Sequence, residues 1–258
     1  MIRDADIQLA NRLANAAGAA IRQHWRGAIG IETKADATPV TLADRAAETA
    51  IRAILDVERP GEGIIGEEFG VSRETASRQW VIDPIDGTTS FAAGRPIFGT
   101  LIALMEEGWP VMGVIDQPIL NERWVGVAGR CTTLNGIATK TRACRELAQA
   151  TLATTSPNCF DDQEAAHFMG LAAKTAHRRL VWGGDCYNYA LLASGHIDIV
   201  VEAGLKLYDF AALIPVVEGA GGQMCDWNGD MLNADSDGRV IALGDPARLD
   251  DVLEALGA

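Results

Sequence analysis

The sequence predicts a layered protein of mixed α and β structure, and two observations support this prediction. In the first half, two helical patterns are followed by apolar runs of strand length that lie between turn residues. In the second half, helical and strand patterns alternate more regularly. With 258 residues, 48% of them hydrophobic, the chain can bury a substantial core as one domain or as two tightly joined halves.

The first half is expected to begin with two amphipathic helices. Apolar residues recur at helical spacing from Ile7 to Ile21, a stretch that reads as a helix and not as a signal peptide. They recur again from Ala43 to Leu55, after the T-x-x-D start signal of Thr41 and Asp44. The run 59–61, Arg-Pro-Gly, is expected to end the second helix.

Strands are expected to follow. The run 64–65 ends in Gly-Glu-Glu, and the run 80–82 ends in a carboxylate, so that Asp83 is expected at a strand end. Segments 98–105 and 111–115 flank a turn and predict a hairpin, and 124–128 with a turn at 135–136 continues the strand-rich region. A soft boundary near Arg145 would divide the chain into halves 1–145 and 146–258.

The second half is expected to contain helices over 164–176, 187–194 and 209–217 and strands over 197–201 and 223–226. Gly195 would end the second of these helices, and Pro215 would kink or loosen the third. No flexible linker or internal repeat is expected between the halves.

The most informative segment is 80–91, WVIDPIDGTTSF. Pro84 prevents a simple helix through this segment, so that Asp83 and Asp86 leave a bent backbone and can converge. Carboxylates and a freed carbonyl, that of Ile85, are the hard oxygen ligands that Mg²⁺ prefers. Gly87 allows close backbone approach, and Thr88 begins a helix whose free amides suit phosphate. The motif therefore predicts a divalent-metal phosphate site.

Each of these residues also has an ordinary structural interpretation. The aspartates could cap backbone amides in a turn, and Asp44 could be only the acid of a capping box. Glu67 could be a surface acid in a loop, and Asp209 could simply cap its helix. Spacing alone does not decide between these interpretations and a metal site.

Composition narrows the classes of function. The formal charge of −13 argues against a nucleic-acid partner. The five cysteines are an odd number without a C-x-x-C pair, and the histidines match no zinc spacing, so neither a disulfide framework nor a zinc site is expected. No uncharged apolar run is long enough to cross a bilayer. We therefore expect a cytoplasmic protein without membrane partners.

The ordered set G-E-E, D-P-I-D-G-T-T-S-F and Y-D-F-A-A followed by E-G-A-G-G resembles the inositol monophosphatase family of magnesium-dependent phosphatases, over nearly the whole chain. The resemblance implies the α-β-α-β-α sandwich of the sugar phosphatases, a homodimer, and two or three Mg²⁺ ions per site. It implies that Thr88 and Asp44 activate water and that Glu67 helps to orient or deprotonate it. The implied metal ligands are Glu67, Asp83, the Ile85 carbonyl, Asp86 and Asp209.

The segment 182–196, with G-D-C-Y and a later Y-D pair, is similar to the histidinol-phosphate phosphatase branch of this family. Histidinol phosphate carries an ammonium group and an imidazole, which Asp185 and Glu202 could bind. The residues expected to contact the phosphate ester are Ile85, Asp86, Gly87, Thr88, Gly183, Gly184, Asp185, Glu202 and Asp209. The alternatives are an inositol-1-phosphate or broader sugar-phosphate phosphatase and, more remotely, a non-enzymatic regulatory protein with this fold.

Overall fold

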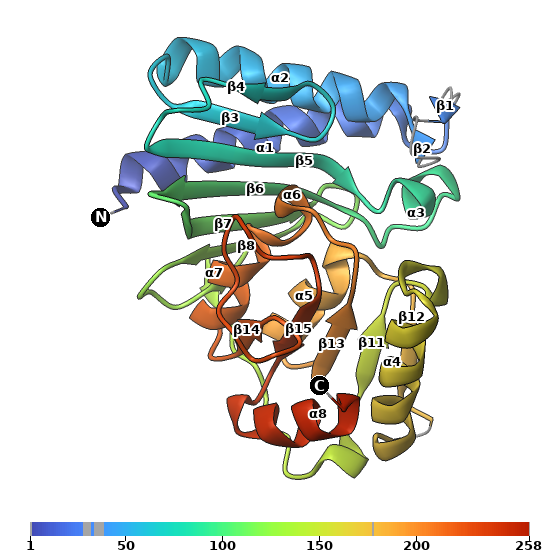
Figure 1. Cartoon of the computed structure of the whole chain (residues 1–258). Helices are drawn as coiled ribbons and strands as arrows, with labels where there is room; N and C mark the ends of the chain where they lie inside the picture. Colours follow the sequence, from blue (N-terminus) through green and yellow to red (C-terminus); the bar gives the residue numbers. More distant parts are fainter. Residues whose placement is uncertain (1, 28–31, 34–38, 177, 258) are drawn as a thin grey trace.

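A computed structural model describes residues 2–27, 32–33, 39–176 and 178–257. Two sheets alternate with three layers of helices, in the order helix, sheet, helix, sheet, helix (Figure 1). The predicted α-β-α-β-α sandwich is therefore confirmed. Within the described residues, every helix is too short or too polar to cross a bilayer.

The larger sheet has the strand order β10-β9-β8-β7-β6-β5-β3-β4 among the described residues. Its neighbouring strands are antiparallel except β3 and β5, which are parallel. The turns at 107–108 and 135–136 have positive φ at both residues, as two-residue hairpins of this twist require. The strands are β3 (Gly63–Gly66), β4 (Gly70–Ser72), β5 (Arg78–Asp86), β6 (Gly99–Glu106), β7 (Trp109–Gln117), β8 (Glu122–Val127), β9 (Thr133–Leu134) and β10 (Ile137–Ala138).

The smaller sheet has the order β12-β11-β13-β15-β14 in the described part of the chain. Its β11 is parallel to β12 and β13, while β15 is antiparallel to β13 and β14. The strands are β11 (Leu152–Thr154), β12 (Leu180–Trp182), β13 (Ile199–Glu202), β14 (Gln223–Cys225) and β15 (Val240–Leu243), and a separate pair is formed by β1 (Glu32–Thr33) and β2 (Pro39–Val40).

The helices form the outer layers and the layer between the sheets. In Figure 1, α1 and α2 cover the outer face of the larger sheet, α5 and α7 lie between the sheets, and α4 and α8 cover the smaller sheet. The helices are α1 (Asp4–His24), α2 (Leu42–Glu58), α3 (Thr88–Ala92), α4 (Asp162–Lys174), α5 (Cys186–Ala193), α6 (Leu207–Phe210), α7 (Leu213–Gly219) and α8 (Leu249–Leu256), with short 3₁₀ turns at Leu147–Gln149, Pro157–Cys159 and Pro246–Arg248.

The alternation of side chains along β5 shows how the layers are held. Trp80 and Ile82 pack under α1 and α2, whereas Val81 points to the opposite face and packs with residues of the smaller sheet and of α5 to α7. Because this middle core takes residues from both sides of residue 145, the two expected halves share one apolar layer. The boundary near Arg145 stays a prediction.

Glycine permits the close approach of α7 to the larger sheet. A Cβ at Gly113 on β7 would lie 1.9 Å from the carbonyl oxygen of Ala212, and one at Gly126 on β8 would lie 2.1 Å from that of Pro215. The prediction of a single helix over 209–217 was wrong, because the chain forms α6 and then α7. Pro215 has no amide proton and lies in the first turn of α7, where that proton is not needed.

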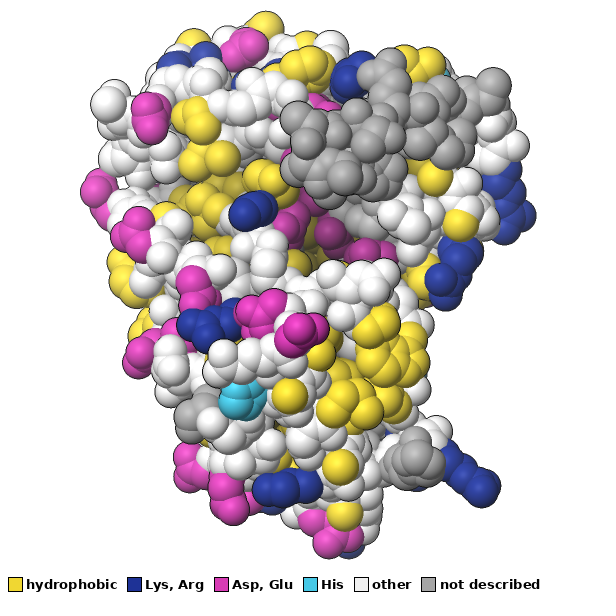
Figure 2. Space-filling view, turned by 45° about the vertical axis from the view of Figure 1, so that its right-hand side comes forward, with side chains coloured by type: hydrophobic (Ala, Val, Ile, Leu, Met, Phe, Trp, Pro, Cys, Tyr) yellow, Lys and Arg dark blue, Asp and Glu magenta, His cyan; other side chains and the backbone are white. Residues whose placement is uncertain are grey.

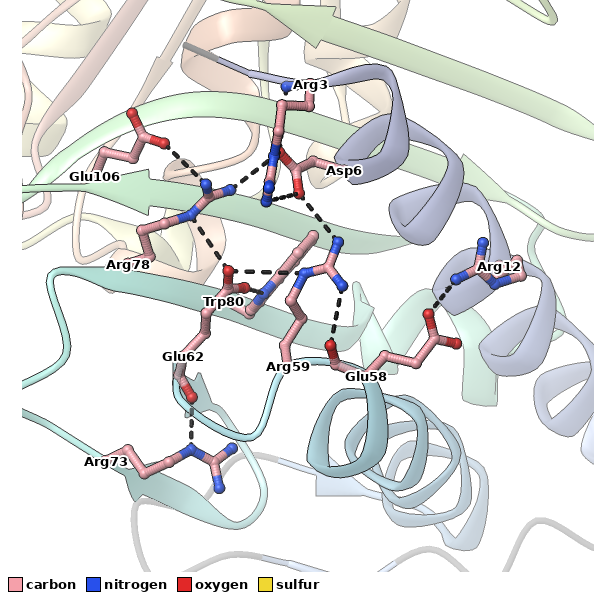
Figure 3. A network of polar contacts seen from close by, with 10 residues as sticks. All are labelled: Arg3, Asp6, Arg12, Glu58, Arg59, Glu62, Arg73, Arg78, Trp80 and Glu106. Carbon is pink, nitrogen blue, oxygen red and sulfur yellow. Dashed lines mark hydrogen bonds and ion pairs between the residues drawn. The ribbon is translucent and has the colours of Figure 1, made fainter.

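A buried carboxylate joins the start of α1 to the end of α2 and to β5 (Figure 3). The guanidinium groups of Arg3, Arg59 and Arg78 each lie 3.2 Å from an oxygen of Asp6. Glu62 continues the network by accepting a 2.6 Å hydrogen bond from the Trp80 indole. Burial alone would raise the pKa of Asp6, but hydrogen bonds from Arg3, Arg78 and Arg59 hold it well below its usual value.

Candidate active site

Three aspartates from two distant segments meet where β5 leaves the larger sheet. One carboxylate oxygen from each of Asp83, Asp86 and Asp209 lies within 4.8 Å of the others. Asp83 is buried, while Asp86 and Asp209 are partly exposed. We call these three residues the acidic cluster.

The local conformation of β5 turns both of its aspartates into the site. The strand does not end at Asp83, as expected, but continues to Asp86 with an irregular register between the two residues. Asp83 accepts a 2.9 Å hydrogen bond from the amide of Ile85, and the carbonyl of Pro84 accepts one of 2.8 Å from Thr100. The expected bend is therefore a bulge inside a strand, and it is held from both sides.

Asp209 caps a helix and also lies in the acidic cluster. It lies in the first turn of α6, and its Oδ2 accepts a 2.6 Å hydrogen bond from the amide of Lys206, the residue before that helix. This hydrogen bond caps the helix. Its carboxylate nevertheless also belongs to the acidic cluster. Capping fixes the carboxylate in place and leaves it able to bind a cation.

The electrostatics of the acidic cluster favour a bound cation. Burial, followed by the charges of Glu67, Asp86 and Asp209, raises the pKa of Asp83 well above its usual value. Burial raises the pKa of Asp209 to about 7. Carboxylates this close together in a largely enclosed site repel one another unless protons or a cation neutralise them. Hard carboxylate oxygens in this number and spacing suit Mg²⁺.

A cavity of about 260 Å³ is lined by the acidic cluster and by several of the residues predicted around it, but not by Asp44, Gly183, Gly184 or Glu202. Figure 2 shows Asp and Glu side chains gathered in a hollow of this face, between the upper and lower parts of the molecule. A larger cavity, of about 620 Å³, lies between α1 and β7 to β9, but its carboxylate Asp116 is already paired with Arg123 at 2.6 Å. The smaller cavity is lined by Glu67, Asp83, Ile85, Asp86, Gly87, Thr88, Thr89, Asp185, Gly204, Lys206, Tyr208 and Asp209.

The predicted pair of Thr88 and Asp44 is in contact. The Thr88 hydroxyl lies 3.2 Å from Asp44 Oδ1 and 3.1 Å from the carbonyl oxygen of Ile85. Asp44 is buried behind Thr88, and it also closes the expected capping box by accepting hydrogen bonds from the amide and hydroxyl of Thr41. The capping box is therefore confirmed, and its contact with Thr88 leaves Asp44 free to have the active-site role as well, which stays a prediction.

Asp185 and Glu202 lie beside the acidic cluster, on its second-half side. Both line a cavity of about 80 Å³ together with Asp86 and Asp209. Asp185 accepts a 3.1 Å hydrogen bond from Ser90, and burial raises its pKa to about 6. Glu202 is buried, and burial raises its pKa to about 7.

Gly183 and Gly184 shape the backbone before Asp185 and are not among the lining residues of these two cavities. Their φ angles are +85° and +130°, and a Cβ at Gly184 would lie 2.3 Å from Asn188 Oδ1. Asp185 itself has a φ of +45°, which is unusual for a residue with a side chain. The two glycines thus direct Asp185 toward the site, and their direct contact with substrate stays a prediction.

Sequence reasoning missed the residues that hold the second-half carboxylates. The amide of Thr155 donates a 2.9 Å hydrogen bond to Glu202 and the Tyr189 hydroxyl donates another of 2.9 Å, while the Thr155 hydroxyl accepts one from the amide of Asp185. Thr155 follows strand β11, so its place after an apolar run was a signal of the same kind as that for Glu67. In the sequence Tyr189 has the pattern of a buried helix residue, and only its hydroxyl distinguishes it from an apolar residue of the core.

The chain belongs to the inositol monophosphatase family, which it matches over residues 3–255, and it is therefore a phosphatase that acts on phosphate monoesters. Enzymes of this family depend on a divalent metal, in general Mg²⁺. The chloroplastic bifunctional phosphatase IMPL2 of Arabidopsis thaliana is 47% identical over 95% of this chain and 73% of its own length. A histidinol-phosphatase of Mycobacterium tuberculosis is 38% identical over 87% of this chain and 88% of its own. The solved structure of an inositol monophosphatase from Zymomonas mobilis is 52% identical, with a TM-score of 0.90 over 99% of this chain and 98% of that one.

Proposed function

We propose that this protein is a magnesium-dependent histidinol-phosphate phosphatase, which converts L-histidinol phosphate and water to L-histidinol and phosphate. The observation that carries the proposal is the pair of carboxylates, Asp185 and Glu202, beside the acidic cluster. A phosphate ester whose alcohol carries an ammonium group and an imidazole gains charge-assisted hydrogen bonds from such a pair. Relatives named histidinol-phosphatase support the same choice.

The two carboxylates are placed for different contacts. Asp185 lies against Gly87, where a Cβ would approach its Oδ2 to 2.8 Å, and so it borders the motif that would bind the phosphate. Glu202 lies deeper and is already held by Thr155 and Tyr189. In the proposed complex, Asp185 faces the cationic end of the substrate and Glu202 adds negative charge behind it.

Glu67, Asp83, the Ile85 carbonyl, Asp86 and Asp209 would hold the Mg²⁺ ions. When bound, Mg²⁺ supplies charge neutralisation for the phosphate and the leaving oxygen and makes water more acidic. Thr88, hydrogen-bonded to Asp44, would orient the attacking water, and the Asp44 carboxylate would accept a proton through the Thr88 hydroxyl. Glu67, at the rim of the same cavity, would assist in orienting that water.

An inositol-1-phosphate phosphatase is the second candidate, and the 52% identical structure of an inositol monophosphatase favours it. Inositol has hydroxyl groups but no positive charge, so an additional carboxylate at position 185 would stabilise it less. The charge of the leaving alcohol therefore separates the two candidates.

The test compares kcat/KM for L-histidinol phosphate, inositol 1-phosphate and 4-nitrophenyl phosphate at one Mg²⁺ concentration with the purified protein. We expect the largest value for histidinol phosphate, loss of activity with EDTA, and recovery when Mg²⁺ is added. A larger kcat/KM for inositol 1-phosphate would contradict the proposed substrate and leave the proposed metal site intact. We also infer a homodimer from the family resemblance, which light scattering on the same sample tests.

A further inference from the structure

Glu48 is a buried carboxylate that the proposed mechanism does not use. It lies on α2 one turn after Asp44, and its side chain is 0% exposed. Its Oε2 accepts a 2.8 Å hydrogen bond from the amide of Glu68, and its Oε1 accepts one of 3.3 Å from the amide of Phe69 and one of 2.7 Å from Arg52 Nε. A buried charge with three donors holds its partners firmly.

The segment that Glu48 holds is the turn between β3 and β4, residues 67–69. Its first residue, Glu67, lines the active-site cavity, and the charge of Glu67 raises the pKa of Asp83. The amide of Glu67 donates a 3.1 Å hydrogen bond to the carbonyl of Ile82, directly before Asp83. The turn is thus joined to β5 at its first amide and to Glu48 at the next two.

The packing around Glu48 leaves its carboxylate little freedom. A Cβ at Gly66 would lie 1.9 Å from Glu48 Oε1, so the carboxylate rests directly on the backbone before Glu67. Arg52, one turn further along α2, also donates a hydrogen bond to the carbonyl of Gly70, at the other end of the turn. Glu48 and Arg52 therefore hold both ends of the turn that presents Glu67.

One face of α2 thus contacts two separate parts of the site. Asp44 holds Thr88, and Glu48, four residues later, holds the turn of Glu67. If Glu48 only stabilised the hairpin of β3 and β4, it could contact either strand at any point along its length. Glu48 instead lies at the one turn of this hairpin that reaches the acidic cluster.

We propose that Glu48 is a positioning residue for Glu67: it fixes the turn 67–69 so that the Glu67 carboxylate points at the proposed Mg²⁺ site. The inference rests on the proposed function. Glu48→Gln has nearly the same shape, but its NH₂ group can only donate a hydrogen bond. The three partners of Glu48 are themselves donors, so at least one of them loses its acceptor. Glu48→Asp keeps the charge and is shorter by one methylene.

The test is Mg²⁺ binding measured by calorimetry on the full chain, without substrate. Loss of a residue that orients a ligand costs about 10- to 100-fold in metal affinity, so we expect a Kd for Mg²⁺ at least about tenfold higher for Glu48→Gln. Glu48→Asp should lie between this variant and the wild type. Ile51→Val is the matched control, because it removes a buried methyl group from the same helix and so lowers stability slightly, and it should leave the Kd within twofold.

A double-mutant cycle decides whether the effect passes through Glu67. If Glu48 acts by orienting Glu67, then Glu48→Gln should change the Kd little further in a Glu67→Gln background. Additive losses, or a wild-type Kd in Glu48→Gln and Glu48→Asp, would overturn the inference and leave the proposed metal site standing. Absence of Mg²⁺ binding by the wild type would overturn both.

Discussion

The amide of Cys186 donates a 2.5 Å hydrogen bond to Oδ2 of Asp86. This contact joins the first residue of α5, in the second half of the chain, to a carboxylate of the acidic cluster at the end of β5. The residue before Cys186 is Asp185, the proposed contact for the leaving alcohol. This one hydrogen bond therefore links the backbone next to Asp185 to Asp86, a proposed metal ligand. The residues proposed for metal binding and for selectivity are therefore structurally linked.

The acidic cluster should be needed for activity but not for stability. Asp83→Asn and Asp209→Asn each remove one anionic oxygen donor, and we expect hydrolysis of histidinol phosphate to fall by about 100-fold or more. The melting temperature of each variant in EDTA should not be lower than that of the wild type, because each substitution removes a negative charge that the neighbouring carboxylates repel. The exposed Asp250→Asn is the control. Activity within fivefold of the wild type in both variants would exclude the proposed ligands.

Asp185 should decide selectivity. Asp185→Asn can still accept the hydrogen bond from Ser90 but has no charge for a cationic alcohol. A charge-assisted hydrogen bond contributes about 1.5 to 3 kcal/mol, so kcat/KM for histidinol phosphate should fall by about tenfold or more. The value for 4-nitrophenyl phosphate should stay within about threefold. Equal losses for the two substrates would assign Asp185 to the metal site instead.

Asp6 should stabilise the fold at neutral pH and lose this effect in acid. Its folded-state pKa is depressed below the unfolded value of about 4, so its contribution is complete above that pH and disappears as pH falls through the lower folded pKa. Asp6→Asn should cost about 2 kcal/mol at pH 7, as loss of hydrogen bonds to charged groups does, and less below pH 4. Urea unfolding of both proteins at several pH values measures this difference, and a constant difference would contradict the depressed pKa.

Gly113 should be required for the packing of α7 on the larger sheet. In Gly113→Ala the new methyl group would meet the backbone carbonyl of Ala212 at 1.9 Å, and backbone can yield only by moving α7. We expect a loss of about 3 kcal/mol or more in the free energy of unfolding. Gly61→Ala, where nothing lies within 4 Å of the added atom, should change it by less than about 0.5 kcal/mol. A similar effect of the two substitutions would refute the close approach.

Local sequence was enough to predict the kind of chemistry and most of the secondary structure. Pro84 restricts the backbone around it and Gly87 permits the positive φ found there, whatever surrounds them, and apolar periodicity identifies α1, α2 and the hairpin of β6 and β7. The same local rules failed at α6 and α7, where apolar periodicity continues across residues 211–212 although the helix is interrupted there and Pro215 lies in the first turn of the second helix. They also placed the end of β5 too early, because a bulge continues a strand past an irregular register.

Only the tertiary structure decided which carboxylates meet. The packing of β5 and α6 around shared cores brings Asp86 and Asp209 to one cavity, and the packing of α2 places Asp44 behind Thr88, which lines the same cavity. Glu48 and Tyr189 could not be selected from the sequence, because a hydrogen bond between distant segments leaves no periodicity or spacing to detect, and the only signal for Thr155 is its place after an apolar run. The sequence by itself therefore determined the type of reaction and predicted the residues for it, while the fold determined which of these residues lie together and which further residues hold them in place.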